Sequence, residues 1–188
     1  MSRVRQAARW NEPRPRKRRG IAAIVFMTAG AFILLSLVTF SPGDPAYFVS
    51  SDVLTEKPAR EVHNAAGIVG AQTAGLFTWL LGGASLLLSL LLLYDAIWLL
   101  SGRQRRFGLL AALGQLLVLA SCAALLTQYA PNDPWRAPLA GGAVGQLILT
   151  PFVTYFNTVG ATLIIGFVLL WAILVGTTSS ISTSARLL

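Results

Sequence analysis

The sequence predicts an all-α integral membrane protein with four transmembrane helices, arranged as two parallel-repeat hairpins with both chain ends in the cytoplasm. Composition is the first observation behind this prediction. Of the 188 residues, 55% are hydrophobic and 12% are charged, whereas an ordinary soluble domain has about 25% charged residues. The second is a set of four long apolar stretches, each close to the roughly 20 residues that a helix needs to cross a bilayer. The third is the net charge of +8, which is concentrated in the first residues and in one short turn.

The chain opens with a basic tail, residues 1–19, and continues into the first span, residues 20–40. Prolines and a lack of apolar periodicity argue against a packed element in the tail. Positive residues beside a span hold that end in the cytoplasm, and the same charges could contact anionic lipid head groups or DNA phosphates. The residues expected to set this topology are Arg16, Lys17, Arg18 and Arg19.

A polar outer loop, residues 41–74, precedes the second span, residues 75–100. The loop has more acidic than basic residues, so nothing holds it in the cytoplasm. The span is apolar on every face. If it were a buried helix of a soluble protein, too little chain would remain to cover it. Its one ionisable side chain, Asp95, is expected near the membrane boundary, facing the arginines that follow. The alternative is a functional intramembrane acid.

A short turn with three arginines and no acid follows the second span. Because basic residues in short loops stay in the cytoplasm, this turn is the strongest topology marker in the chain. Arg103, Arg105 and Arg106 are its basic residues. The turn leads into a third span, residues 108–128, which predicts an antiparallel hairpin closed on the cytoplasmic side.

The second outer loop, residues 129–158, leads to a fourth span at about 159–177. Its later part contains Pro151 and Asn157, so we do not expect one straight helix with the span that follows. This part could lie in the membrane interface or re-enter the bilayer. Residues 179–188 are polar and are expected to begin a cytoplasmic linker.

The two outer loops share a pattern, P-x-D-P followed by G-x-x-G and a span. The glycines are Gly67 and Gly70 in the first loop, and Gly142 and Gly145 in the second. Because both halves start in the cytoplasm, a duplication would relate them by an axis along the membrane normal. Coincidence is the alternative, since both patterns are common. Close backbone approach is the expected use of the glycines, and a ligand loop is the other reading.

The motifs of catalysis are missing from the sequence. It contains no phosphate loop G-x-x-x-x-G-K-[ST], no G-x-S-x-G, no H-E-x-x-H and no cysteine cluster. The single Cys122 excludes an intramolecular disulfide, and the single His63 has no Cys or His neighbour with which to hold zinc. We therefore expect no catalytic residue, no cofactor and no metal in this chain.

The loop residues nevertheless carry a family resemblance, which extends over about residues 10–180. A basic tail and a first span end in Ser-Pro-Gly-Asp-Pro at 41–45, and His-Asn-x-x-Gly-x-x-Gly-Ala follows at 63–71. Gly-Gly-x-x-Gly at 141–145 and Phe-Asn-x-x-Gly at 156–160 come later. In order and spacing these pieces resemble the four-helix membrane domain of the FtsK/SpoIIIE bacterial DNA translocases. One difference is Gln-Thr-Ala-Gly at 72–75, where that family commonly has an acidic residue.

The resemblance implies a membrane anchor that targets a translocase to the division septum of the bacterial inner membrane and contacts other cell-division membrane proteins. It also implies a homo-hexamer, with ATP, Mg and DNA bound by a motor outside these residues. A small polytopic transporter or channel subunit is the alternative function. The candidate interaction and packing residues are Asp44, Asn64, Gly67, Gly70, Gly142, Gly145, Asn157 and Gly160.

Overall fold

The chain is described by a computed structural model over residues 16–41, 43–46, 62–101, 109–129 and 140–178, and these residues contain helices and no strand. The elements, in order, are α2 (Arg16–Val38), α3 (Gly67–Leu81), the 3₁₀ turn η1 (Gly82–Ala84), α4 (Ser85–Leu100), α5 (Leu109–Tyr129) and α6 (Gly142–Thr178). Four helical stretches are long and apolar enough to cross a membrane: Arg19–Val38, Gly67–Leu100, Leu110–Tyr129 and Gly142–Val175. The predicted all-α class with four membrane-spanning stretches is confirmed.

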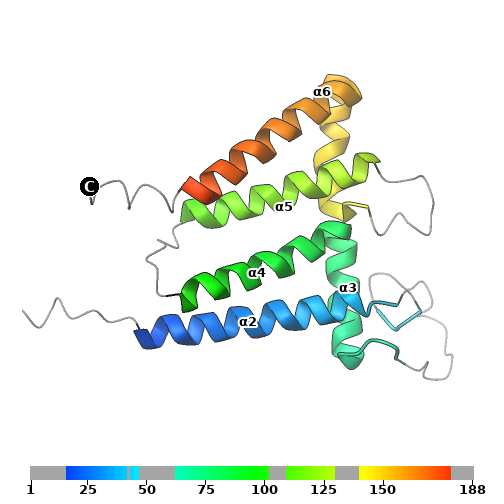
Figure 1. Cartoon of the computed structure of the whole chain (residues 1–188). Coiled ribbons are helices and arrows are strands. Elements are labelled where there is room, and N and C mark those ends of the chain that lie inside the picture. The colour runs from blue at the N-terminus through cyan, green and yellow to red at the C-terminus, as the bar shows by residue number, and fades with distance from the viewer. Residues whose placement is uncertain (1–15, 42, 47–61, 102–108, 130–139, 179–188) are drawn as a thin grey trace, which may run out of the picture.

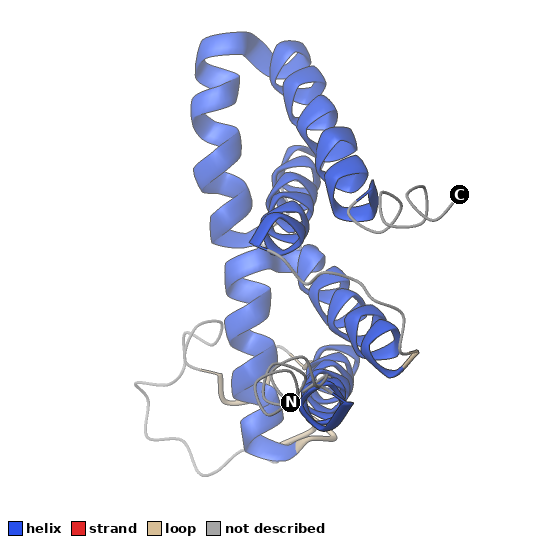
Figure 2. Cartoon of the chain, turned by 90° about the vertical axis from the view of Figure 1, so that its left-hand side faces the viewer, coloured by secondary structure: helices blue, strands red, loops and turns tan. Residues whose placement is uncertain are grey.

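The helices run in two directions (Figure 1). α2, α4, α5 and the later part of α6 lie roughly side by side, and the start of α2 and the end of α6 lie at the same end of the molecule. α3 and the first part of α6 run across the opposite end, which we call the loop end. Figure 2 shows these two segments stacked end to end in one column. We call α3 together with residues 142–156 of α6 the crosswise strip.

The second span differs from its prediction as one helix over residues 75–100. Helix α3 already begins at Gly67, inside the predicted outer loop 41–74, and it ends at Leu81. Gly82 then has a φ of +57°, a conformation that glycine adopts without steric cost, and it turns the chain through η1 into α4. The predicted single helix is therefore wrong: its first part belongs to the crosswise strip.

The second outer loop also contains helix. α6 begins at Gly142, within the predicted loop 129–158, and runs past Pro151 to a break at Asn157, where φ is 58° and ψ is 170°. The expected interruption between this segment and the fourth span is confirmed, and it lies at Asn157 because the left-handed backbone there cannot continue a helix.

The basic residues 16–19 are part of a helix. Arg16 to Arg19 form the first turn of α2, whereas we expected an unpacked segment up to residue 19. Arginine and lysine are good helix formers, so the helix of the first span extends through them. Residues 1–15 lie outside the described part of the chain.

The two halves repeat the same backbone path. Among the described residues, positive φ occurs at Gly67 (68°), Gly82 (57°), Gly142 (62°) and Asn157 (58°). The offset that places Gly67 on Gly142 also places Gly82 on Asn157. Each half therefore consists of a long helix, a loop, a crosswise helix that starts and ends at left-handed residues, and a helix that returns along the first.

Small residues hold the paired helices together. In the first half α2 packs on α4, and Ala23 and Gly30 of α2 are buried. A Cβ at Gly30 would lie 3.0 Å from Cγ of Leu93, so the glycine allows close contact. In lipid, where apolar burial gives little driving force, such close packing associates helices. Many large apolar side chains are exposed instead, as expected for a surface that faces lipid: Ile21, Val25, Leu90, Ile97, Leu110, Leu116, Leu163 and Phe167.

Candidate interaction site at the loop end

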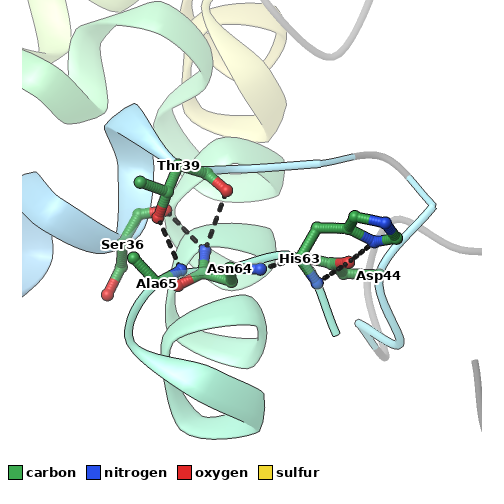
Figure 3. A network of polar contacts seen from close by, with 6 residues as sticks. All are labelled: Ser36, Thr39, Asp44, His63, Asn64 and Ala65. Atoms are coloured by element: carbon green, nitrogen blue, oxygen red, sulfur yellow. Dashed lines mark hydrogen bonds and ion pairs between the residues drawn. The ribbon is translucent and has the colours of Figure 1, made fainter. Parts of the chain in front are cut away.

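Asp44 ties the two ends of the first outer loop together. Its own backbone N–H donates to the carbonyl of Ser41 over 3.1 Å, and the residue is 1% exposed. The two carboxylate oxygens accept the backbone N–H groups of His63 and Asn64, each over 2.9 Å (Figure 3). Hydrogen bonds to a carboxylate are among the stronger ones. The His63 ring, at 3.4 Å from the same carboxylate, stays 70% exposed.

Asn64 connects this tie to the end of α2. Its Nδ2 donates to the carbonyl of Ser36 over 2.8 Å and to that of Thr39 over 3.4 Å. The first carbonyl belongs to the last turn of α2 and the second follows that helix directly, where no intrahelical partner is available. The Thr39 hydroxyl in turn accepts the N–H of Ala65 over 3.1 Å (Figure 3). Asn64 therefore satisfies the end of one helix and directs the chain into the next.

The first pair of glycines fits around Asn64. Gly67 donates its N–H to the carbonyl of Asn64 over 2.8 Å and turns with positive φ. A Cβ at Gly70 would lie 2.3 Å from Oδ1 of Asn64 and 2.4 Å from Cβ of Ala66, so only glycine fits there. One turn further on, Gln72 donates to the carbonyl of Pro45 over 2.8 Å. The start of α3 is thus fixed to the loop by both side-chain and backbone contacts.

The second pair of glycines makes a different contact, because it joins the two halves. A Cβ at Gly142 would lie 2.6 Å from the carbonyl carbon and oxygen of Leu80. One at Gly82 would lie 1.3 Å from the carbonyl oxygen of Ala140, which accepts the N–H of Gly83 over 3.0 Å. The C-terminal end of α3 therefore meets the start of α6 backbone to backbone. We call this contact the half-to-half joint.

Helix α5 also contacts the half-to-half joint. Cβ atoms at Gly141 and Gly145 would lie 1.5 Å and 2.5 Å from the carbonyl oxygen of Ala123. Ala123 is fully buried and forms the core cluster with Leu81 and Ala84. This cluster combines residues from both halves, so the joint is also where the apolar core of the described residues lies.

Asn157 and Gly160, the remaining predicted residues, act within α6. The Asn157 side chain accepts the N–H of Thr158, the next residue, over 2.7 Å. A Cβ at Gly160 would lie 3.1 Å from Cβ of Phe156, on the preceding turn. Gln128 of α5 donates to the Thr162 hydroxyl. These contacts connect the end of α5 to the start of the returning helix.

Asp95 has a partner that the sequence analysis did not consider. Its two carboxylate oxygens accept from Nε2 of Gln115 over 3.0 Å and 2.9 Å, and the residue is 3% exposed. Gln115 belongs to α5, so the bonds connect the two halves at a distance from the half-to-half joint. The arginines expected to face Asp95, at positions 103, 105 and 106, lie outside the described residues.

The structure thus brings Asp44, Asn64, Gly67 and Gly70 together in one cluster and places Gly142 and Gly145 at the half-to-half joint. The sequence analysis missed Ser36, Thr39, Gly82, Ala140 and Gln115. Two of these had a signal: Gly82 is the first of a glycine pair inside an apolar stretch, and Gln115 is an uncharged polar residue inside a span. The others contribute mainly backbone groups, which carry no sequence signal.

Comparison with known families identifies the family of this chain. A family model described as the 4TM region of DNA translocase FtsK/SpoIIIE matches residues 16–188. The chain belongs to this family. Since the family's matched region is its membrane part and the motor is a separate region, this chain is a multi-pass membrane domain and not the catalytic part.

One curated member of the family shows how much of a whole protein this chain covers. DNA translocase FtsK of Shewanella oneidensis is 29% identical over 149 residues, which make up 76% of this chain and 15% of the relative. The chain thus spans about 15% of the length of the curated relative that it matches. No solved structure matches the chain significantly.

Proposed function

We propose that this chain anchors an ATP-driven DNA translocase in the bacterial inner membrane and positions it at the division septum, where chromosome segregation is coupled to cell division. Family membership carries the proposal, because the matching region is the membrane part of such translocases. The arrangement of the helices agrees with an anchor. The start of α2 and the end of α6 lie at one end of the molecule (Figure 1), so a motor attached after α6 would lie on the same side as the basic residues of α2.

In this proposal the loop end faces the periplasm and both chain ends face the cytoplasm. The basic first turn of α2 supports this orientation, because positive residues beside a span stay inside. Replacing the basic residues 16–19 by Gln is expected to weaken the inside preference of residue 1, measured with a reporter enzyme that is active only outside. An unchanged orientation would mean that Arg103, Arg105 and Arg106 dominate.

The loop end is the proposed contact surface for other cell-division membrane proteins. Its tie through Asp44 and Asn64 presents a fixed backbone, and His63, Ala65 and Gly67 are exposed on it. A preorganised surface loses less entropy when a partner binds. The motor, with ATP, Mg and DNA, and the homo-hexamer are proposed on the family resemblance.

The decisive experiment exchanges the domain within the full-length translocase. A fluorescent fusion in which an unrelated four-span anchor replaces this chain is expected to stay in the membrane but to lose its accumulation at septa. Conversely, this chain fused alone to the fluorophore is expected to reach septa. Septal accumulation of the exchanged protein would overturn the proposal.

A matched pair of surface variants locates the contact. Ala65 and Ser101 are both exposed, the first at the loop end and the second at the opposite end. Ala65→Glu is expected to reduce septal accumulation, and Ser101→Glu to leave it unchanged. Equal effects of the two variants would argue against recognition at the loop end.

The alternative function, a small transporter or channel subunit, would need a polar path across the membrane. Among the described side chains of α2, α4, α5 and α6, the buried charged one is Asp95, and Gln115 bonds both of its oxygens. No observation on the described residues favours transport. Ion or solute flux through vesicles that contain the purified chain would favour this alternative.

A further inference from the structure

The outward side of the crosswise strip is uncharged and mostly apolar. Neither α3 nor residues 142–156 contain Asp, Glu, Lys or Arg. Large side chains are exposed along both segments: Ile68, Val69, Leu76, Trp79, Leu147, Tyr155 and Phe156. A soluble surface rarely exposes so many apolar residues in one region. The strip therefore needs a cover.

The described part of the chain does not supply this cover. The side of α3 that faces the other helices is lined mostly by small residues: Gly70, Ala71, Ala74, Gly75 and Thr78 are buried there, together with Leu81. The larger apolar residues lie on the opposite side of the helix. This distribution is the reverse of a soluble amphipathic helix, in which the large apolar residues face the core.

The length of α4 places the strip at the depth of the lipid. α4 has 16 residues, and at 1.5 Å per residue it spans about 24 Å. The hydrocarbon core of a bilayer is about 30 Å thick, and α4 with the 3 residues of η1, at about 2.0 Å each, only just reaches this length. Because η1 connects α3 directly to α4, α3 must lie at the boundary of the hydrocarbon and not out in the water.

The threonines of the strip suit this depth. The hydroxyls of Thr73, Thr150 and Thr154 donate to carbonyls of their own helix over 2.7 Å, 2.7 Å and 2.8 Å, so they need no water. Unbonded polar groups are costly in an apolar environment. Trp79 and Tyr155, both exposed, are residue types enriched where acyl chains meet head groups.

We propose that the crosswise strip is a lipid-binding surface that lies flat in the leaflet away from the chain ends. Its outward side chains insert among phospholipid acyl chains just below the head groups. Lipid is the occupant because the strip continues, through η1 and Asn157, into spans whose exposed apolar residues face lipid as well. The inference depends on the membrane-spanning fold and not on septal positioning or on the motor.

Cysteine labelling of the purified chain in phospholipid vesicles tests the proposal. In a Cys122→Ser background, Val69→Cys reports on the strip and His63→Cys on the neighbouring loop. The two positions are similarly exposed in the protein alone, 67% for Val69 and 70% for the His63 side chain. With a water-soluble maleimide on both sides of the bilayer, we expect labelling at least ~10 times slower at position 69 than at 63, since lipid excludes the reagent from buried interfacial sites.

Three other outcomes would contradict the proposal, each for a different reason. Equal rates at both positions before unfolding in SDS would overturn the proposal, because the strip would then face water. Protection in native membranes but not in vesicles of the purified chain would also overturn it, because a partner protein would be the cover. Protection that appears only at low lipid-to-protein ratios would instead assign the surface to a second copy of the chain.

Depth-resolved fluorescence quenching checks the same proposal without a cysteine. One variant retains only Trp79 and the control retains only Trp171, which is exposed within the later part of α6; the other tryptophans become Phe. Lipids brominated near the head group should quench Trp79 most strongly, and lipids brominated near the chain end should quench Trp171. Trp79 quenched by aqueous acrylamide but not by any brominated lipid would overturn the proposal.

Discussion

Gly82 and Asn157 occupy the same position in the two halves, and both turn the chain from a crosswise helix into a returning one with φ near 60°. Their surroundings differ. Gly82 is in close contact with the carbonyl of Ala140, whereas Asn157 is exposed and its side chain accepts the N–H of Thr158. Both halves therefore need a residue with positive φ at this position, and the space around it determines which residue can stand there.

The first prediction follows from this difference. Asn157→Gly is expected to stabilise the fold by about 1 kcal/mol, because glycine relieves the strain of a left-handed backbone, which outweighs the loss of the exposed side-chain bond to Thr158. The reverse exchange, Gly82→Asn, should cost about 3 kcal/mol or more, since its Cβ has no room. Reversible unfolding by SDS in mixed micelles, followed by circular dichroism, measures both. Two effects of the same sign would contradict this account.

The second prediction concerns the tie at the loop end. Asn64→Ala should cost about 2–3 kcal/mol, because it leaves buried carbonyls without a donor. Ser36→Ala is the control, since Asn64 contacts the carbonyl of Ser36 while the Ser36 hydroxyl donates within its own helix to Phe32. The control should lose clearly less stability in the same SDS titration. An Asn64→Ala variant that loses no more stability than the control would contradict the role assigned to the Asn64 bonds.

The third prediction concerns Asp95 and Gln115. In a double-mutant cycle with Asp95→Leu and Gln115→Leu, we expect a coupling energy of about 1 kcal/mol, in the range found for polar pairs within membranes. Gln115→Leu alone should be the worse variant, because it leaves a buried carboxylate with fewer donors. Additive effects of the two substitutions would mean that the bonds do not hold the halves together.

The fourth prediction compares two glycines of α6. A Cβ at Gly145 would lie 2.2 Å from Oγ1 of Thr127, whereas one at Gly166 would meet nothing within 4 Å. Gly145→Ala should therefore separate α5 from α6 and destabilise the chain by about 2 kcal/mol. Gly166→Ala should stabilise it by up to about 1 kcal/mol through helix propensity. Similar unfolding midpoints for the two variants would refute the role assigned to Gly145.

Much of the fold could be predicted because membrane spans are set by length and apolar composition. The same reasoning failed at α3, since a helix that lies along the membrane can be as apolar as one that crosses it. Hydropathy reports the surroundings of a residue and not the direction of its helix. The break at Asn157 was predictable because a polar residue interrupts the apolar run there, whereas Gly82 gave a weaker signal, as glycine is common within spans.

The candidate site was predictable in its members but not in its bonds. Asp44 and Asn64 were selected from the loop motifs, yet their contact bridges a long loop, and no local pattern pairs them. The partner of Asp95 was expected among the arginines that follow it in sequence. Those arginines lie outside the described residues, and within these Gln115 is a partner that was not predicted, because the antiparallel hairpin brings the start of α5 beside the end of α4.

The tie between Asp44 and residues 63 and 64 has a practical consequence for protein engineering. Its hydrogen bonds hold the two ends of the loop together. The positions of Pro45 and Val62 therefore do not depend on the segment between them. Lengthening a closed loop costs little, about 0.6 kcal/mol for each doubling of its length. The segment between these two residues is therefore a natural insertion point for an epitope or a small binding domain, which would be displayed on the loop end while the helices that cross the membrane keep their packing.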